Sequence, residues 1–145
     1  MRTNARVSTD NAGFLLAKAS QRFNDLLIAG LTRKGYPEVR PSYGSVLVPL
    51  FADGDLRLGE IADRARMSKQ AITGLVARCE NDGLIARVRD PDDGRAFRIS
   101  LTGRGRRLQT AAEATLAEID DEIVAILGPR KRDALIEALK GVMDL

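Results

Sequence analysis

The spacing of apolar residues changes in the middle of the chain, and this change is the strongest constraint on the fold. Up to residue 82, apolar residues recur every three or four positions, which is typical of amphipathic helices. In residues 84–89 and 95–101 the interval becomes two, which indicates strands. The segment DPDDG, residues 90–94, separates these two runs and is rich in turn-forming residues. The sequence therefore predicts several helices followed by one short β-hairpin.

The helices before the hairpin are bounded by recognisable signals. Glycine and proline mark the loop KGYPEVRP, Ser68 is a suitable N-cap, and Gly83 is a suitable C-terminal cap. Pro49 is expected to bend or stop the second helix near its end, and residues 52–55 are expected to form a turn. The predicted helices cover residues 12–31, 41–51, 57–66 and 68–82.

Two further helices are predicted after the hairpin. Thr102 can cap a long helix, which Gly128 and Pro129 interrupt. The apolar spacing then predicts a last helix over residues 130–143. The fold class is therefore mainly α with a small β-hairpin, and the length of 145 residues fits one domain.

Composition argues against several classes of protein. The longest apolar run, residues 46–52, is far shorter than the ~20 residues of a membrane span, and no signal peptide is visible. The chain has one cysteine, Cys79, and no histidine, so it lacks the commonest general base and metal ligand. We therefore expect a cytoplasmic protein that is not an enzyme, with no cofactor, no metal site and no membrane contact.

Positive charge is concentrated in the middle of the chain. Residues 57–107 hold 12 basic and 7 acidic residues, a net charge of +5, whereas residues 108–145 hold 4 and 8, a net charge of −4. Eighteen of the 23 basic residues are arginine, the side chain best suited to binding phosphate. This segregation favours a polyanionic partner for the middle segment.

Two short helices joined by a tight turn, followed at once by an arginine-rich hairpin, have the layout of a winged helix-turn-helix. The major groove of DNA is about 12 Å wide and admits one helix. In the 68–82 helix, Lys69 can pair with guanine, Gln70 with adenine, and Arg78 with a phosphate. The alternative is an ordinary solvated polar face. The candidate DNA-binding residues of this helix are Ser68, Lys69, Gln70, Thr73, Gly74, Ala77 and Arg78.

Residues 57–108 closely resemble the winged helix-turn-helix of MarR-family transcriptional regulators. The resemblance is carried by five motifs in order: L-x-E-I-A, S-K-x-x-I-T, N-D-G-L-I, D-x-R and S-L-T-x-x-G-R. It implies a homodimer that binds a pseudo-palindromic operator in double-stranded DNA, more often as a repressor than as an activator. It also implies release by a small, frequently aromatic, ligand. On this basis we expect residues 1–35 and 102–145 to form a helical dimerisation region and residues 36–101 to form the DNA-binding region of a single structural domain.

The resemblance also assigns roles in the hairpin. It implies that Arg95 enters the minor groove and that Asp93 holds this arginine in position. Arg87 and Arg89 are candidate DNA-binding residues on the same hairpin, whereas Asp90 and Asp92 are expected to form the turn. At the start of the second helix, Arg40 and Tyr43 are candidate phosphate contacts.

Gly74 departs from the family, many members of which carry a larger polar residue there. It either lets the backbone approach DNA closely or removes one base contact.

Other candidate sites have plainer alternatives. Phe14, Phe23, Tyr36, Tyr43 and Phe51 either line an effector cleft or belong to the core. Cys79 lies on the predicted core-facing stripe, although a redox switch is the alternative, and the acidic run 118–123 is a solvated face or a metal site. Two rival functions remain open: a winged-helix protein-interaction module that does not bind DNA, and a redox- or metal-gated regulator.

Overall fold

The computed structural model describes residues 8–145, so the first seven residues of the predicted dimerisation segment 1–35 lie outside the described part. The described chain is mainly helical with one small antiparallel sheet, which confirms the predicted fold class. In chain order the elements are α1 (Ala12–Arg33), η1 (Pro41–Tyr43), α2 (Gly44–Asp53), β1 (Leu56–Arg57), α3 (Leu58–Ala65), α4 (Lys69–Asn81), β2 (Ile85–Arg89), β3 (Phe97–Leu101), α5 (Gly103–Leu127) and α6 (Pro129–Met143).

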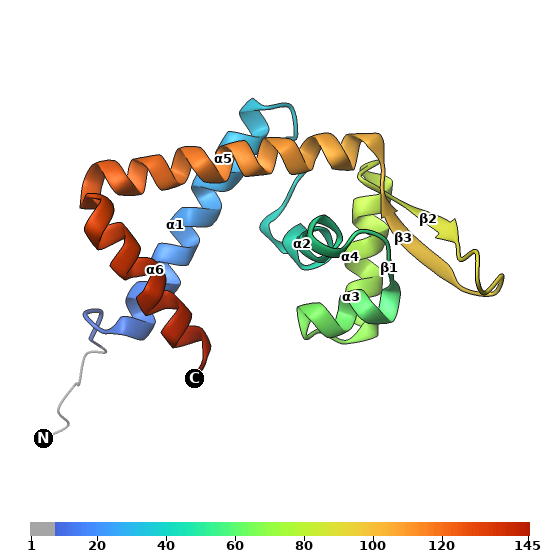
Figure 1. Ribbon diagram of the computed structural model, residues 1–145, viewed down its shortest axis with the longest axis horizontal. Helices are drawn as coiled ribbons and strands as arrows, with labels where there is room; N and C mark the ends of the chain where they lie inside the picture. The colour runs from blue at the N-terminus through green and yellow to red at the C-terminus, as the bar shows by residue number, and fades with distance from the viewer. Residues whose placement is uncertain (1–7) are drawn as a thin grey trace, which may run out of the picture.

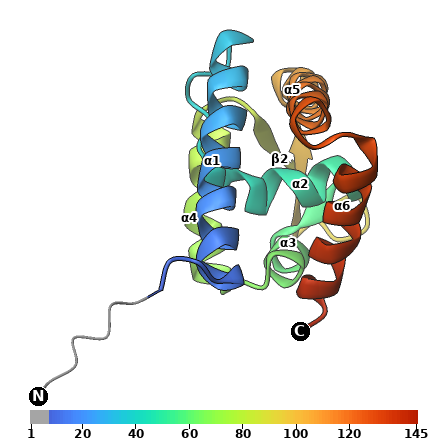
Figure 2. The same ribbon diagram turned by 90° about the vertical axis from the view of Figure 1, so that its left-hand side faces the viewer.

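The elements form two lobes joined by the long helix α5 (Figure 1). One lobe contains α2, α3, α4 and the hairpin formed by β2 and β3, which we call the wing. The other contains α1 and α6, and the view turned by 90° shows both helices in front of the first lobe (Figure 2). The wing therefore projects at the end of the molecule opposite α6.

Local capping fixes where the helices begin. The side chains of Asn11, Ser68 and Thr102 accept hydrogen bonds from backbone N–H groups in the first turns of α1, α4 and α5. Each bond satisfies a donor that the helix itself cannot pair. The caps at Ser68 and Thr102 are those that the sequence predicted.

The prediction that Pro49 bends or stops the second helix near its end was wrong about the stop. Helix α2 continues past Pro49 to Asp53 and ends at Gly54, which has a positive φ of 76°. Leu47 and Leu50, on either side of the proline, are buried in the core. Their packing holds the helix although one backbone hydrogen bond is missing.

The sheet has three strands in the order β1–β3–β2, so the predicted two-stranded hairpin was incomplete. Strand β1 has only two residues, Leu56 and Arg57, which pair with Ile99 and Arg98. Such a short strand forms because β3 is available as a partner, and local sequence carries no signal for it. Its effect is to join the start of α3 to the wing.

The register of the wing assigns its side chains to two faces. Arg87 lies opposite Ile99, and Val88 lies opposite Arg98. Directly opposed residues share a face, so Arg87 is on the same face as the buried Ile99, while Val88 is on the other. The apolar residues of the outer wing are largely exposed, since Val88 is 47% exposed and Phe97 is 50% exposed.

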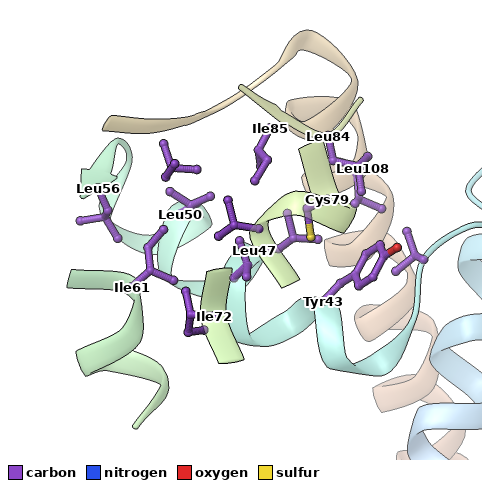
Figure 3. Packing of buried hydrophobic residues seen from close by; sticks show 14 of the residues in the cluster. Tyr43, Leu47, Leu50, Leu56, Ile61, Ile72, Cys79, Leu84, Ile85 and Leu108 are labelled. Atoms are coloured by element: carbon purple, nitrogen blue, oxygen red, sulfur yellow. The ribbon is translucent and has the colours of Figure 1, made fainter. Parts of the chain in front are cut away.

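The core lies between α2, α3, α4, the sheet and the first half of α5 (Figure 3). Ile61, Ile72, Cys79 and Leu84 are fully buried there, and Leu108 joins α5 to the same cluster. This core fixes α4 and the base of the wing in one rigid unit.

The start of α5 lies unusually close to the wing. A Cβ atom at Gly105 would collide with the backbone oxygen of Leu84. Only glycine therefore allows this approach of α5 to the start of the hairpin.

Candidate nucleic-acid interface

Helix α4 has one buried face and one exposed face. Ile72, Val76 and Cys79 face the core. The opposite face carries hydrogen-bonding, basic or small residues, and every one of them is exposed. These residues are Ser68, Lys69, Gln70, Thr73, Gly74, Ala77 and Arg78. The structure thus leaves all the sequence-predicted candidates of this helix accessible to a partner.

The exposed face of α4 is free of acidic side chains until its last turn. Glu80 is the first, and its carboxylate lies 3.5 Å from Nε of Arg87 on β2. This ion pair links the end of α4 to the base of the wing. It also partly neutralises Arg87, so the positive charge of the wing rests more on Arg89 and Arg95, which are exposed.

The tip of the wing is closed by backbone hydrogen bonds. The N–H of Asp90 donates to the oxygen of Ala96, and the N–H of Ala96 donates to the oxygen of Asp93, each at 3.0 Å. The carboxylate of Asp93 accepts from the backbone N–H of Arg95 at 3.0 Å. The predicted contact between Asp93 and Arg95 is thus present at the backbone of Arg95, whose side chain is exposed, and its entry into the minor groove stays a prediction.

Asp90 has a larger role than the turn that the sequence predicted. Its Oδ1 accepts from the N–H of Asp92 at 2.9 Å, which is the expected turn contact. Its Oδ2 accepts from Nε and Nη2 of Arg57, at 3.0 and 2.7 Å, and from Nε of Arg98, at 3.3 Å. Asp90 is thus a buried carboxylate surrounded by donors from the wing and from β1.

The pKa of Asp90 reflects this environment. The N–H of Asp92, followed by the guanidinium of Arg57, lowers the pKa of Asp90 to about 2, against the opposing effect of burial. The carboxylate is therefore fully ionised near neutral pH, and the ion pairs with Arg57 and Arg98 are both maintained.

Tyr43 does not fit the predicted phosphate contact. Its ring is buried, as Figure 3 shows, and its hydroxyl donates to the carboxylate of Asp82 at 2.5 Å. Burial and this bond raise the pKa of Tyr43 to about 12. Because Asp82 is the C-cap of α4, the tyrosine holds the end of α4 against the start of α2. Arg40, by contrast, is exposed.

An apolar cavity of about 150 Å³ lies where α1, α2 and α5 meet. Leu27, Leu47, Phe51 and Leu108 are among its apolar walls, whereas polar atoms come from few side chains. These polar side chains are Arg40, Gln109 and Glu113. Among the sequence-predicted ligand residues, Phe51 therefore lies in a cavity wall.

The other predicted ligand residues do not line this cavity. Phe23 is one helical turn before Leu27 on α1 and is partly exposed, and Phe14 is further away and lies beside Lys18. Tyr36 is buried against the guanidinium of Arg104, 4.7 Å from its ring centre. Tyr43 is buried in the core. The cavity is built mainly from aliphatic residues, so the aromatic pattern in the sequence does not predict it.

Cys79 and the acidic run behave as structural elements. Burial raises the pKa of the Cys79 thiol to about 12, so the reactive thiolate is disfavoured.

In the run 118–123, Asp120 accepts two hydrogen bonds from Arg132 of α6. Among residues 8–145, no group of three or more potential ligand side chains has an arrangement suited to a metal ion. None of the helices in this range is both long and apolar enough to cross a bilayer.

Comparison with known proteins gives consistent matches. Residues 50–96 match the model of the MarR family. The homoprotocatechuate degradative operon repressor of Escherichia coli is 32% identical over 86 residues, which cover 59% of this chain and 58% of the repressor. The chain spans about half the length of the curated relatives that it matches, from 48% to 58% for the first two.

Two solved structures match over nearly the whole chain. A probable transcriptional regulator from Pseudomonas aeruginosa is 31% identical, with a TM-score of 0.75, and the match covers 92% of this chain and 97% of that one. The Mycobacterium tuberculosis MarR family protein Rv2887, in complex with salicylic acid, is 26% identical, with a TM-score of 0.67 and coverage of 93% and 99%. The winged helix-turn-helix, its flanking helices and these matches together show that the chain belongs to the MarR family.

Proposed function

We propose that this protein is a dimeric, sequence-specific DNA-binding transcriptional regulator that acts as a repressor. The observation that carries the proposal is the fully exposed, hydrogen-bonding face of α4 beside a wing with exposed arginines. Helix α4 would enter the major groove, with Lys69 and Gln70 against base edges, and Arg95 would reach the adjacent minor groove. The protein would act by binding alone, in the cytoplasm, without catalysis.

The dimer would be built by the lobe that contains α1 and α6. Helix α6 has no buried residue in the single chain, yet it carries Leu135, Leu139 and Val142, each about two-fifths exposed. Ile126 near the end of α5 is 82% exposed. A second copy would cover this apolar surface. Dimerisation would also present two copies of α4 to two half-sites of one operator.

The cavity between α1, α2 and α5 would bind the effector. A cavity of about 150 Å³ with aliphatic walls holds a molecule the size of one benzene ring. Arg40 at this cavity could pair with a carboxylate on such a ring. The relative Rv2887, whose structure contains salicylic acid, supports a ligand of this class.

Selection of bound duplexes from a random DNA pool tests the proposal. We expect an enriched inverted repeat with half-site centres about one helical turn apart, ~34–36 Å. Placed upstream of a reporter, this repeat should lower expression when the protein is present. Failure to enrich any sequence, even at low salt, would instead favour a winged-helix module that binds other proteins.

A further inference from the structure

We propose that Asp90 is a positioning residue for DNA recognition, because its buried carboxylate tethers the wing to the start of α3 and thereby fixes where Arg95 lies relative to α4. This inference rests on the proposed DNA-binding function. Asp90 would act without touching DNA. Its negative charge by itself would repel the phosphates of DNA.

The carboxylate of Asp90 connects elements that are far apart in the chain. One carboxylate oxygen accepts from the N–H of Asp92 in the tip turn, and the other accepts from Arg57 and Arg98. Arg98 lies on β3 of the wing itself, but Arg57 lies on β1, 33 residues before Asp90 in the chain. The side chain of Asp90 therefore joins the tip of the wing to β1, which leads directly into α3.

Arg57 is itself held at the start of α3. The backbone N–H of Arg57 donates to the carboxylate of Glu60 in the first turn of α3, at 3.0 Å. The guanidinium of Arg57 meets Asp90 through two nitrogens, which restricts both distance and angle. Since α3 packs against α4 in the core, the orientation of the wing is fixed relative to α4 through Arg57.

Beyond the pairing of Arg57 with Arg98, the outer part of the wing has no neighbouring strand in the described part of the chain. The wing leaves the core beyond Ile85 and Ile99, and Val88 and Phe97 are about half exposed. A two-stranded ribbon without a packed face is flexible on its own. Asp90, with its side chain fully buried under the two arginines, links this outer part to β1 by a side-chain contact.

Charge and geometry predict opposite effects when Asp90 is replaced, and this makes the inference testable. Asp90→Asn removes one negative charge from the DNA-facing side, so long-range electrostatics alone would strengthen binding. Loss of the tether would weaken it, because Arg95 would have to be ordered on binding. We expect weakening by about tenfold, within the range for loss of one base-contacting arginine.

Asp92→Asn is the matched control. Asp92 is exposed in the same turn, and its contact with Asp90 uses the backbone N–H, which the substitution keeps. It removes the same charge without breaking the tether, so binding should be unchanged or slightly tighter. Arg57→Lys is a second test variant, because it keeps the charge but loses the two-nitrogen contact. It should weaken binding as Asp90→Asn does.

The experiment measures dissociation constants for a duplex that the parent protein selects from a random pool and for a mixed-sequence duplex of equal length. A double-mutant cycle of Asp90→Asn with Arg95→Ala distinguishes positioning from general damage. If Asp90 acts through Arg95, its substitution should have no further effect once Arg95 is absent.

Three results would overturn the inference: Asp90→Asn binding as tightly as the parent, additive effects in the cycle, or the same weakening in Asp92→Asn. If Asp90→Asn fails to fold, as judged by circular dichroism, Arg57→Lys decides, and an unchanged dissociation constant overturns the inference. A parent protein that binds neither duplex would refute the proposed function itself, which is a different outcome.

Discussion

Gly74 lies in the middle of the exposed face of α4, where a larger residue has room. Nothing lies within 4 Å of the position that a Cβ atom would occupy. The protein's own packing therefore does not require glycine at this position.

Gly74→Ala should stabilise the protein by up to about 1 kcal/mol, because alanine is the better helix former. Denaturant unfolding measures this gain. The same variant should bind the selected duplex more weakly if the backbone of α4 lies against DNA, which a parallel titration measures. Lower stability of Gly74→Ala would contradict the absence of neighbouring atoms around the Cβ position of residue 74.

Gly105 is the opposite case, since it permits a close approach of α5 to the wing. Gly105→Ala should destabilise the protein by about 1–3 kcal/mol, the usual cost of overpacking. Gly103→Ala is the matched control, because the nearest atom to its Cβ is the end of the flexible Arg107 side chain, 3.3 Å away. Comparable midpoints of unfolding for the two variants would show that the approach is not tight.

The lowered pKa of Asp90 predicts a pH dependence of stability. Its pKa is about 2 in the folded protein and about 3.9 when unfolded, so the ionised form stabilises the fold. That contribution is complete above about pH 4 and is lost as the pH falls to about 2. The difference in unfolding free energy between the parent and Asp90→Asn should shrink over this interval, as urea titrations would measure. A constant difference would exclude titration of Asp90 there.

At the scale of elements, the wing combines a buried base with an exposed, cationic outer part. Arg95→Ala should weaken binding to the selected duplex by about 1–3 kcal/mol and relax sequence preference at the contacted position. Arg33→Ala, which removes an exposed arginine from the last turn of α1, serves as the control. Equal losses in both variants would mean that Arg95 contributes only net charge.

The elements that the sequence predicted are those whose signals are local. The caps at Ser68 and Thr102 and the spacing around Ile72 depend on residues within a few positions, and the structure places these features as expected. Strand β1 exists only through pairing with β3, about 40 residues later, so its sequence carries no pattern. The continuation of α2 past Pro49 similarly depends on tertiary packing.

The same distinction separates the parts of the candidate site. The exposed face of α4 follows from helical periodicity, which sequence alone provides. The contact between Asp90 and Arg57 joins distant segments. The sequence does not predict it, because an aspartate in DPDDG is already explained by its role in the turn. The cavity combines aliphatic residues from three helices. Phe51 is therefore the one predicted ligand residue that lines it.

At the scale of the whole molecule, α6 and the end of α5 carry exposed apolar residues, whereas α4 and the wing carry exposed basic residues on their surface. Leu139→Glu places a charge within the exposed apolar surface of α6. We expect this variant to be monomeric by analytical ultracentrifugation and to lose most of its affinity for a two-half-site duplex. Lys140→Glu, at the neighbouring exposed position, should remain dimeric. A dimeric Leu139→Glu would place the interface elsewhere.

The most direct test of the central claim, that α4 and the wing bind a DNA duplex, is the dissociation constant measured over a range of salt concentrations. We predict that log Kd rises linearly with log salt, with a slope of about 0.9 for each phosphate contacted. The slope should fall by about 1 when Arg78, which we propose contacts a phosphate, is replaced by alanine. Absence of binding at low salt, or an affinity insensitive to salt, would contradict the account.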